Sequence, residues 1–318
     1  SPEIREHSPM AEFIAWCSER FGRTFADYDA FHAWSVAERG DFWTAVWEHC
    51  NVIGERGATA LVNGDRMLDA RFFPEAKLNF AENLLRETGD GDALVFRGED
   101  KVDYRLSWNE LRALVSRLQQ ALKAQGIGPG DRVAAMMPNM PETVALMLAT
   151  ASIGAIWSSC SPDFGEQGVL DRFGQIAPKL FIACDGYWYN GKRQDVDAKV
   201  RAVSASLAVP ALIVPYAGDS AALAASIAGG TTLGDFIAPF EAKVLTFERL
   251  PFSHPLYVLF SSGTTGVPKC IVHSAGGTLL QHLKEHRFHC GLRRGEKLFY
   301  FTTCGWMMWN WLASGLAV

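Results

Sequence analysis

The chain has 318 residues, which is enough for one large domain or two ordinary ones. Its 48% hydrophobic and 20% charged residues are typical of a globular protein, and its net charge of −5 excludes the basic surface on which nucleic-acid binding depends. The seven cysteines form no CxxC pair and the first residues show no signal peptide, so we expect reduced thiols in a cytoplasmic protein.

Residues 1–90 are predicted to form a mainly helical N-terminal segment. Ser8 and Pro9 are suited to begin a helix that ends at Gly22. The apolar stripe at positions 42, 43, 46 and 47 predicts a further helix. The pair Asn63-Gly64 predicts a hairpin turn between 61–62 and 67–68. A short helix is expected after Asn79, ending by residue 89.

The following part of the chain begins with a predicted hairpin and a capped helix. Two β-rich runs flank a turn at residues 98–100, which predicts an antiparallel pair of strands. Ser107 and Glu110 then have the spacing of a capping box. They are expected to begin a helix with leucines along one side, and Gly126 is expected to end it.

Strands and helices alternate from residue 132 onward. Strands are predicted at 132–137, 155–159, 180–184 and 211–215, and helices at 141–153, 166–176 and 194–207. This alternation predicts an α/β fold with doubly wound, mostly parallel sheets. The uncharged stretch between Glu142 and Asp163 fits a buried helix and strand of such a fold better than a membrane span. We expect a surface connection at 217–240, a helix at 278–290 and a strand at 297–301.

One loop stands out as a ligand-binding feature. An apolar run, LYVLF, stops at Ser261, and a second β-type run begins at Cys270. The residues between them are small or hydroxylated, and Lys269 adds a positive charge. Glycines allow the backbone to approach a ligand, and backbone N–H groups bind anions. The sequence therefore predicts a polyphosphate site made by Ser261, Ser262, Gly263, Thr264, Thr265, Gly266 and Lys269.

Two other interpretations of this loop were weighed. A flexible linker is not normally held between two strands of core composition. The common P-loop needs four residues between its glycines, followed by Lys and Ser or Thr. Here Pro268 directly precedes Lys269 and Cys270 follows it, so the loop is a different kind of phosphate-binding loop.

The string SSGTTGVPK resembles the signature of acyl-adenylate-forming enzymes, a superfamily that includes acyl-CoA synthetases, luciferases and peptide-synthetase adenylation domains. Most members have Gly where this chain has Cys270. The stretches RFFPEAKLNFAENLL, PKCIVHSAGGTLLQHLKEHRFH and FYFTTCGWMMWNWLASGLA are similar to the acetyl-CoA and acetoacetyl-CoA synthetases, the last two to the acetoacetyl-CoA branch. That branch also lacks Gly after Pro-Lys, which agrees with Cys270.

This resemblance implies a two-step ligase reaction that uses ATP, Mg²⁺ and coenzyme A. Acetoacetate, or in the alternative acetate, propionate or butyrate, would form an acyl-adenylate that coenzyme A converts to a thioester. The loop residues would bind the β- and γ-phosphates, with Lys269, Thr264 and Thr265 as the catalytic groups. No metal centre built from side chains is predicted. The implied partners are small molecules only, and the oligomeric state is left open.

The resemblance also implies two further sets of binding residues. Lys192 and Arg193 would meet the ribose 3′-phosphate of coenzyme A, although a solvated turn explains them equally well. Trp306, Met307, Met308, Trp309 and Asn310 would line the acyl pocket, with Asn310 as a donor to the ketone of acetoacetate. A hydrogen-bonding pocket discriminates between acids far better than an apolar one.

The expected domain organisation is incomplete. Residues 1–90 would be the N-terminal segment of the acetyl/acetoacetyl-CoA synthetase type, and 91–318 the first part of the AMP-binding domain. The chain ends in the apolar run WNWLASGLAV, without the family's later motifs or its C-terminal lid domain. We therefore expect a fragment that is inactive on its own.

Two alternatives from other classes were kept. The chain could be a non-catalytic nucleotide-binding module. It could also be a zinc hydrolase, because His282, Glu285 and His286 fit the pattern HxxEH on one helix, with His289 as a third ligand.

Overall fold

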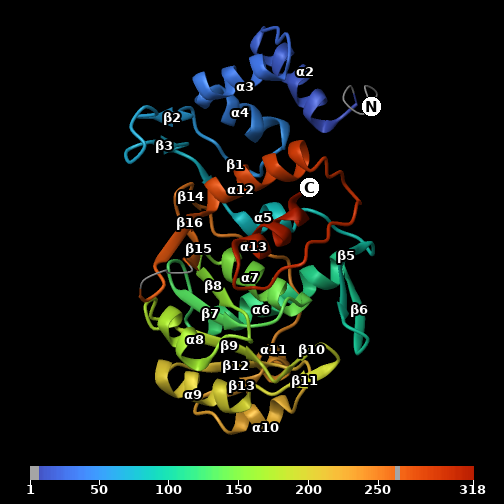
Figure 1. Cartoon of the computed structure of the whole chain (residues 1–318), viewed down its shortest axis with the longest axis vertical. Helices are drawn as coiled ribbons and strands as arrows, with labels where there is room; N and C mark the ends of the chain where they lie inside the picture. The colour runs from blue at the N-terminus through green and yellow to red at the C-terminus, as the bar shows by residue number, and fades with distance from the viewer. Residues whose placement is uncertain (1–6, 262–265) are drawn as a thin grey trace.

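The computed structural model describes residues 7–261 and 266–318. Three helices form one end of the molecule, α2 (Pro9–Phe21), α3 (Tyr28–Ala37) and α4 (Arg39–His49) (Figure 1). The Ser8 hydroxyl accepts a hydrogen bond from the N–H of Ala11, and Gly22 ends α2 with a φ of 61°. Both caps confirm the prediction, because the capping side chain and the left-handed glycine act on their own helix.

Short elements link these helices to the rest of the chain. They are β1 (Gly54–Glu55), β2 (Leu61–Val62), β3 (Arg71–Phe72), β4 (Lys77–Leu78) and α5 (Phe80–Leu84). The predicted hairpin partner was wrong, because β2 pairs with β3 and not with residues 67–68. Met67 and Leu68 are 91% and 98% exposed at the tip. The helix after Asn79 is also shorter than predicted, ending at Leu84.

The predicted hairpin and capped helix that follow are confirmed. They are β5 (Asp92–Gly98), β6 (Val102–Ser107) and α6 (Trp108–Ala124). The Ser107 side chain accepts from the backbone of Glu110, and the Glu110 carboxylate accepts from the backbone N–H of Ser107. This capping box satisfies N–H groups at the start of α6 that have no partner within the helix.

A seven-stranded sheet lies at the centre, in the order β13-β12-β9-β7-β8-β15-β16. All neighbours are parallel except β15 and β16, so the predicted doubly wound, mostly parallel α/β fold is confirmed. The strands are β7 (Arg132–Met136), β8 (Ile156–Cys160), β9 (Leu180–Cys184), β12 (Ala211–Val214), β13 (Gly230–Thr232), β15 (Pro255–Phe260) and β16 (Cys270–Ser274).

Helices cover both faces of this sheet. They are α7 (Pro141–Ser152), α8 (Glu166–Phe173), α9 (Asp197–Leu207), α10 (Ser220–Ala225), α11 (Leu233–Ile237), α12 (Ala275–Lys284) and α13 (Met307–Ser314). Every residue of β8 and β9 is buried, which is why neither strand alternates between apolar and polar residues. The two buried serines of β8, Ser158 and Ser159, donate to backbone carbonyl oxygens. In the described part of the chain, no helix has the length and apolar character needed to cross a membrane.

The remaining elements are small. The strands β10 (Tyr187–Tyr189) and β11 (Lys192–Gln194) form a hairpin, and β14 (Leu250–Pro251) pairs with β4. A π-helix (Glu285–His289) continues directly from α12, and a 3₁₀ turn (Gly315–Ala317) follows α13.

Two predictions for connecting segments were wrong. Residues 217–240 are not only a surface connection, since they form α10, α11 and the edge strand β13, which pairs with β12. The predicted strand at 297–301 does not form. Phe299 and Phe301 are 83% and 87% exposed there, and no described strand pairs with them. An apolar run becomes a strand only when a neighbour supplies hydrogen-bond partners and covers a face.

Candidate functional site

The predicted phosphate loop follows the carboxyl end of β15, beside β8. The strand order reverses at β7, because β8 lies on one side of it and β9 on the other. In open parallel sheets, ligands bind outside the carboxyl ends of strands near such a reversal. The described ends of the predicted loop therefore lie at the edge of the sheet where folds of this kind usually bind ligands.

The base of the loop is closed by a pair of residues. The N–H of Ser261 donates to the carbonyl oxygen of Lys269 at 3.0 Å, and the N–H of Lys269 donates to the Ser261 hydroxyl at 3.1 Å. Gly266 has a φ of 112°, a conformation that favours glycine. The Lys269 side chain is exposed at this position. The predicted residues Ser262, Gly263, Thr264 and Thr265 lie outside the described residues.

Gln175, which follows helix α8, contacts the end of the loop that leads into β16. Its Nε2 donates to the carbonyl oxygen of Pro268 at 2.8 Å, and its Oε1 lies 3.7 Å from the Cys270 thiol. Cys270 is exposed beside this amide. The end of the loop that carries Lys269 is therefore held against α8 as well as by β15.

Two cations that sequence reasoning missed lie near the same edge. The guanidinium of Arg172 is 4.5 Å from the ring centroid of Phe164 and 6.0 Å from that of Phe260, the last residue of β15. The ammonium of Lys199 donates to the carbonyl oxygens of Pro162 and Phe164, and burial lowers its pKa. Both residues fall within predicted helices, where sequence alone does not show which side chains lie at this edge of the sheet.

Residues 304–310 cross the carboxyl ends of β7 and β8. The Ser159 hydroxyl donates to the carbonyl oxygen of Cys304 at 2.8 Å, and the indole N–H of Trp309 donates to Asn139 Oδ1 at 2.9 Å. Burial raises the pKa of the Cys160 and Cys304 thiols, so both stay protonated. These thiols support the edge structurally and are not nucleophiles.

The five residues predicted to line an acyl pocket are divided between two faces. Trp306 and Met307 are 58% and 44% exposed, whereas Trp309 and Asn310 are buried. Met308 is half-buried between them. The exposed pair is open to solvent, whereas Trp309 contacts Asn139 after β7 and Asn310 lies against Tyr257 of β15.

Asn310 is an unusual buried group. Its side chain is 1% exposed, and neither its amide nitrogen nor its amide oxygen has a hydrogen-bond partner of normal geometry among the described residues. It lies against Tyr257 of β15, whose hydroxyl pKa is raised by burial. Contact with the Asn310 side chain opposes that rise in pKa, so Asn310 and Tyr257 form a buried polar pair.

The residues predicted to meet coenzyme A lie on the β10–β11 hairpin. Asn190 and Gly191 form its turn with φ values of 51° and 72°. The Arg193 guanidinium donates to the backbone carbonyl oxygens of Ala217 and Asp185, while Lys192 is exposed. In this arrangement the Arg193 guanidinium bonds the backbone beside the hairpin, and both Lys192 and Arg193 are exposed.

The histidine pattern HxxEH does not form a metal centre. His282 and His286 both lie within hydrogen-bonding distance of Ser314 Oγ, at 2.8 and 3.1 Å. The Glu285 carboxylate pairs with Lys284, and His289 Nε2 also contacts Lys284. Within residues 7–261 and 266–318, no group of three or more His, Cys, Asp or Glu side chains could hold a metal. The zinc alternative therefore finds no support in the described structure.

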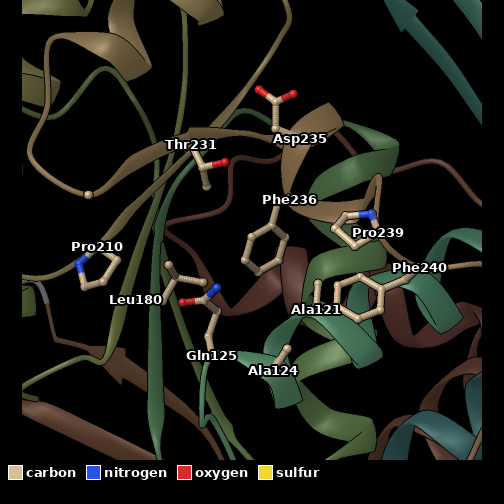
Figure 2. A pocket seen from close by; sticks show the side chains of 11 residues that line it. Ala121, Ala124, Gln125, Leu180, Pro210, Thr231, Asp235, Phe236, Pro239 and Phe240 are labelled. Carbon is tan, nitrogen blue, oxygen red and sulfur yellow. The ribbon is translucent and has the colours of Figure 1, made fainter.

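A cavity of about 280 Å³ lies elsewhere, among α6, α11 and the amino ends of β9 and β12 (Figure 2). Phe236, Phe240, Leu180 and Ala121 give it an apolar lining, with Asp235 at its rim. Because the loop follows the carboxyl end of β15, this cavity is on the opposite edge of the sheet from the candidate site.

Comparison with known proteins gives two family matches. Residues 80–318 match the model of the AMP-binding enzyme family, and residues 28–84 match that of the acetyl-coenzyme A synthetase N-terminus. The chain is 85% identical over 316 residues to an acetoacetyl-coenzyme A synthetase of Rhizobium meliloti, covering 99% of this chain and 49% of that protein. It is 41% identical over 326 residues to an acetoacetyl-CoA synthetase of Gallus gallus, again covering 99% of this chain and 49% of that protein.

A solved structure is also similar. The acetoacetyl-CoA synthetase from Streptomyces lividans superposes with a TM-score of 0.93 and 40% sequence identity, covering 100% of this chain and 49% of that one. The chain thus spans about half the length of the curated relatives it matches.

Proposed function

Because this chain belongs to the AMP-binding enzyme family, we propose that it contributes the phosphate loop and acyl-binding residues of an acetoacetate–CoA ligase. The observation that carries the proposal is the 85% identity to an acetoacetyl-coenzyme A synthetase over 316 residues. The alternative within the same class is a ligase for acetate, propionate or butyrate. In this proposal the chain is divided as predicted from sequence, into an N-terminal segment at 1–90 and the first part of the AMP-binding domain at 91–318.

The proposed reaction has two steps. The carboxylate oxygen of acetoacetate attacks the α-phosphorus of ATP, the α–β anhydride bond breaks, and pyrophosphate leaves. The sulfur of coenzyme A then attacks the acyl carbon, the bond to AMP breaks, and the thiol proton is released. Such chemistry depends on positioning and charge neutralisation and needs no protein nucleophile.

The loop residues have distinct roles in this proposal. Lys269 neutralises charge on the β- and γ-phosphates together with Mg²⁺, and Thr264 and Thr265 bind phosphate oxygens. Support comes from the closed base at Ser261 and Lys269, which keeps the lysine at the sheet edge. Lys192 is proposed to meet a phosphate of coenzyme A, whereas Arg193 is already committed to backbone oxygens.

The proposed compartment is the cytoplasm. All seven cysteines are free, and five of them are buried. Unpaired thiols in this number are typical of a reducing compartment.

The test uses a chimera, defined here as this chain joined in place of the matching half of the Rhizobium meliloti relative. We expect the chimera to release AMP with acetoacetate, ATP and coenzyme A, and to prefer acetoacetate to butyrate. Activity with acetate but none with acetoacetate would favour the alternative ligase. The 318-residue chain alone is expected to give no acetoacetate-dependent exchange between ATP and pyrophosphate.

Replacing the loop lysine tests its role in the chimera. Lys269→Met should lower kcat/KM for ATP by about one hundred-fold, since it removes a charge aimed at the phosphates. Lys243→Met is a suitable control, because Lys243 is also exposed but lies outside the loop. Steady-state AMP release at varied ATP measures the effect. Equal kinetics for the two variants would contradict the assignment of Lys269.

A further inference from the structure

A buried polar cluster joins the helix after the phosphate loop to the helix that carries the acyl-binding residues. His282 and His286 extend from α12 and the π-helix, and Ser314 ends α13. Their exposed fractions are 5%, 0% and 1%. We call these three residues the His–Ser–His cluster. The reaction proposed above uses none of them.

The contacts within the cluster converge on one hydroxyl. Ser314 Oγ lies 2.8 Å from His282 Nδ1 and 3.1 Å from His286 Nε2. His286 Nε2 is also 2.8 Å from the carbonyl oxygen of Trp311, which can only accept a hydrogen bond. His286 Nε2 therefore carries the proton and donates it. Burial lowers the pKa of both histidines, which favours the neutral ring in each.

The cluster and Asn310 share one side of α13. Ser314 is four residues after Asn310, a spacing that places both on the same helix face. The helix has only eight residues, too few to be stable without tertiary contacts. Three directional contacts at Ser314 and Trp311 fix the rotation of α13, and with it the direction of the Asn310 amide.

The histidine side of the cluster is connected through the chain to the predicted phosphate loop. Helix α12 begins directly after β16, the strand that follows Lys269. Gly276 in its first turn packs on Phe252 so closely that an added Cβ would lie 2.1 Å from the ring. The start of α12 is therefore held in one position by close packing. The histidines of α12 and of the π-helix that continues from it can in turn hold α13 in place.

We propose that His282, His286 and Ser314 are positioning residues that fix helix α13 relative to helix α12. In this way they set the enzyme's selectivity between carboxylic acid substrates. This inference rests on the proposed function, because it assumes that α13 contacts the acyl group. It predicts that loosening the cluster changes discrimination between acids while leaving the use of ATP intact.

The first test measures selectivity in the chimera. Ser314→Ala should lower the ratio of kcat/KM for acetoacetate to that for butyrate by about ten-fold, with KM for ATP unchanged. Loss of folded enzyme alone would lower both acids equally and leave the ratio unchanged. A folded Ser314→Ala enzyme with the wild-type ratio would overturn the proposal.

A matched control and a rescue pair sharpen this test. Ser204 in α9 is a buried serine whose hydroxyl has no partner among the described residues, so Ser204→Ala should keep the wild-type ratio. His286→Gln retains an amide donor near the place of Nε2 and should keep most of the selectivity, whereas His286→Leu should lose it. Equal selectivity of the Gln and Leu variants would count against the proposal.

A second measurement does not depend on the proposed function. In the 318-residue chain, Ser314→Ala should raise amide hydrogen exchange in residues 307–314 by about ten-fold relative to Ser204→Ala. Unchanged exchange would refute the positioning role directly. If the unaltered chimera shows no preference for acetoacetate, the proposed function fails, and the exchange experiment still decides whether the cluster fixes α13.

Discussion

Asn310 combines near-complete burial with an amide that has no hydrogen-bond partner of normal geometry among the described residues. The sequence indicated it only as a polar residue among tryptophans and methionines. Its burial against Tyr257 could not be predicted, because it depends on how α13 packs on β15. Exposure of Trp306 and Met307 could not be predicted either, since large apolar side chains are ordinarily core residues.

Removing the Asn310 amide tests its proposed contact with the substrate ketone. In the chimera, Asn310→Leu should narrow the preference for acetoacetate over butyrate by about ten-fold or more, because an apolar pocket discriminates poorly between these acids. Competition between the two acids measures the change. Asn109→Leu replaces an exposed asparagine and serves as the control. An unchanged preference in folded Asn310→Leu enzyme would exclude the role.

His282 makes the stability of the chain depend on pH. Burial, with smaller effects from His286 and His273, lowers its pKa from 6.5 to about 3. The native state therefore favours the neutral ring. Its contribution is fully present above the unfolded-state pKa and is lost as pH falls from there towards the folded value.

A His282→Asn variant isolates this effect. Asparagine can still reach Ser314 but does not titrate. Below about pH 6.5, wild-type stability should fall relative to the variant by about 1.4 kcal/mol per pH unit. Urea unfolding of both chains between pH 7 and pH 5 measures the difference. A difference that stays constant over this range would show that His282 is not held neutral.

At the level of elements, local rules accounted for most helix ends. Ser8, Gly22, Ser107 and Glu110 act on backbone groups within a few residues, so their roles followed from sequence. The hairpin partner of β2 and the strand expected at 297–301 depended on distant neighbours, and both predictions were wrong. The π-helix after α12 was not foreseen, because its residues continue an ordinary helical pattern.

Asn79 shows how one residue serves several elements. Its Oδ1 accepts from Glu82 at the start of α5. Its Nδ2 donates to the carbonyl oxygens of Ala151, Ser152 and Glu248, the last one 169 residues away. The capping role was readable from sequence, whereas the tie to α7 and the segment before β14 needed the structure.

Exchanging the Asn79 amide for a carboxylate should strongly destabilise the folded chain. Asn79→Asp keeps the cap but places a negative charge against three carbonyl oxygens, and should lower the free energy of unfolding by about 3 kcal/mol or more. Asn51→Asp makes the same exchange at an exposed position and should be nearly neutral. Chemical denaturation of the 318-residue chain compares them. Similar losses of unfolding free energy for the two variants would contradict a structural role for the Asn79 Nδ2 hydrogen bonds.

At the scale of the whole molecule, an aromatic stack joins the N-terminal helices to the π-helix that continues from α12. Phe13 of α2 and Phe288 of the π-helix lie 4.1 Å apart between ring centroids, with 6° between their planes. Arg287 donates to the carbonyl oxygen of His49, and Arg293 pairs with Glu12. The predicted helical N-terminal segment therefore packs against α12 and the π-helix, at one end of the molecule (Figure 1).

Breaking this stack should loosen the N-terminal helices. Phe288→Ala removes a side chain that is 5% exposed and should cost about 3–5 kcal/mol of unfolding free energy. Phe299→Ala removes one that is 83% exposed and should cost less than about 0.5 kcal/mol. Urea unfolding, with limited proteolysis near residues 50–56, reports both effects. Equal protease resistance of the two variants would argue against a structural role for the stack.

The sequence by itself determined the alternation of strands and helices, the helix caps and the position of the predicted phosphate loop after an apolar strand. Each of these depends on residues near one another in the chain, where propensity and turn chemistry act directly. Only the tertiary structure decided the order of the sheet, the contacts of Arg172 and Lys199 at the carboxyl ends of β15 and β8, and the meeting of His282 and His286 with Ser314. Those contacts depend on which buried faces pack together, and no local pattern of residues specifies that choice.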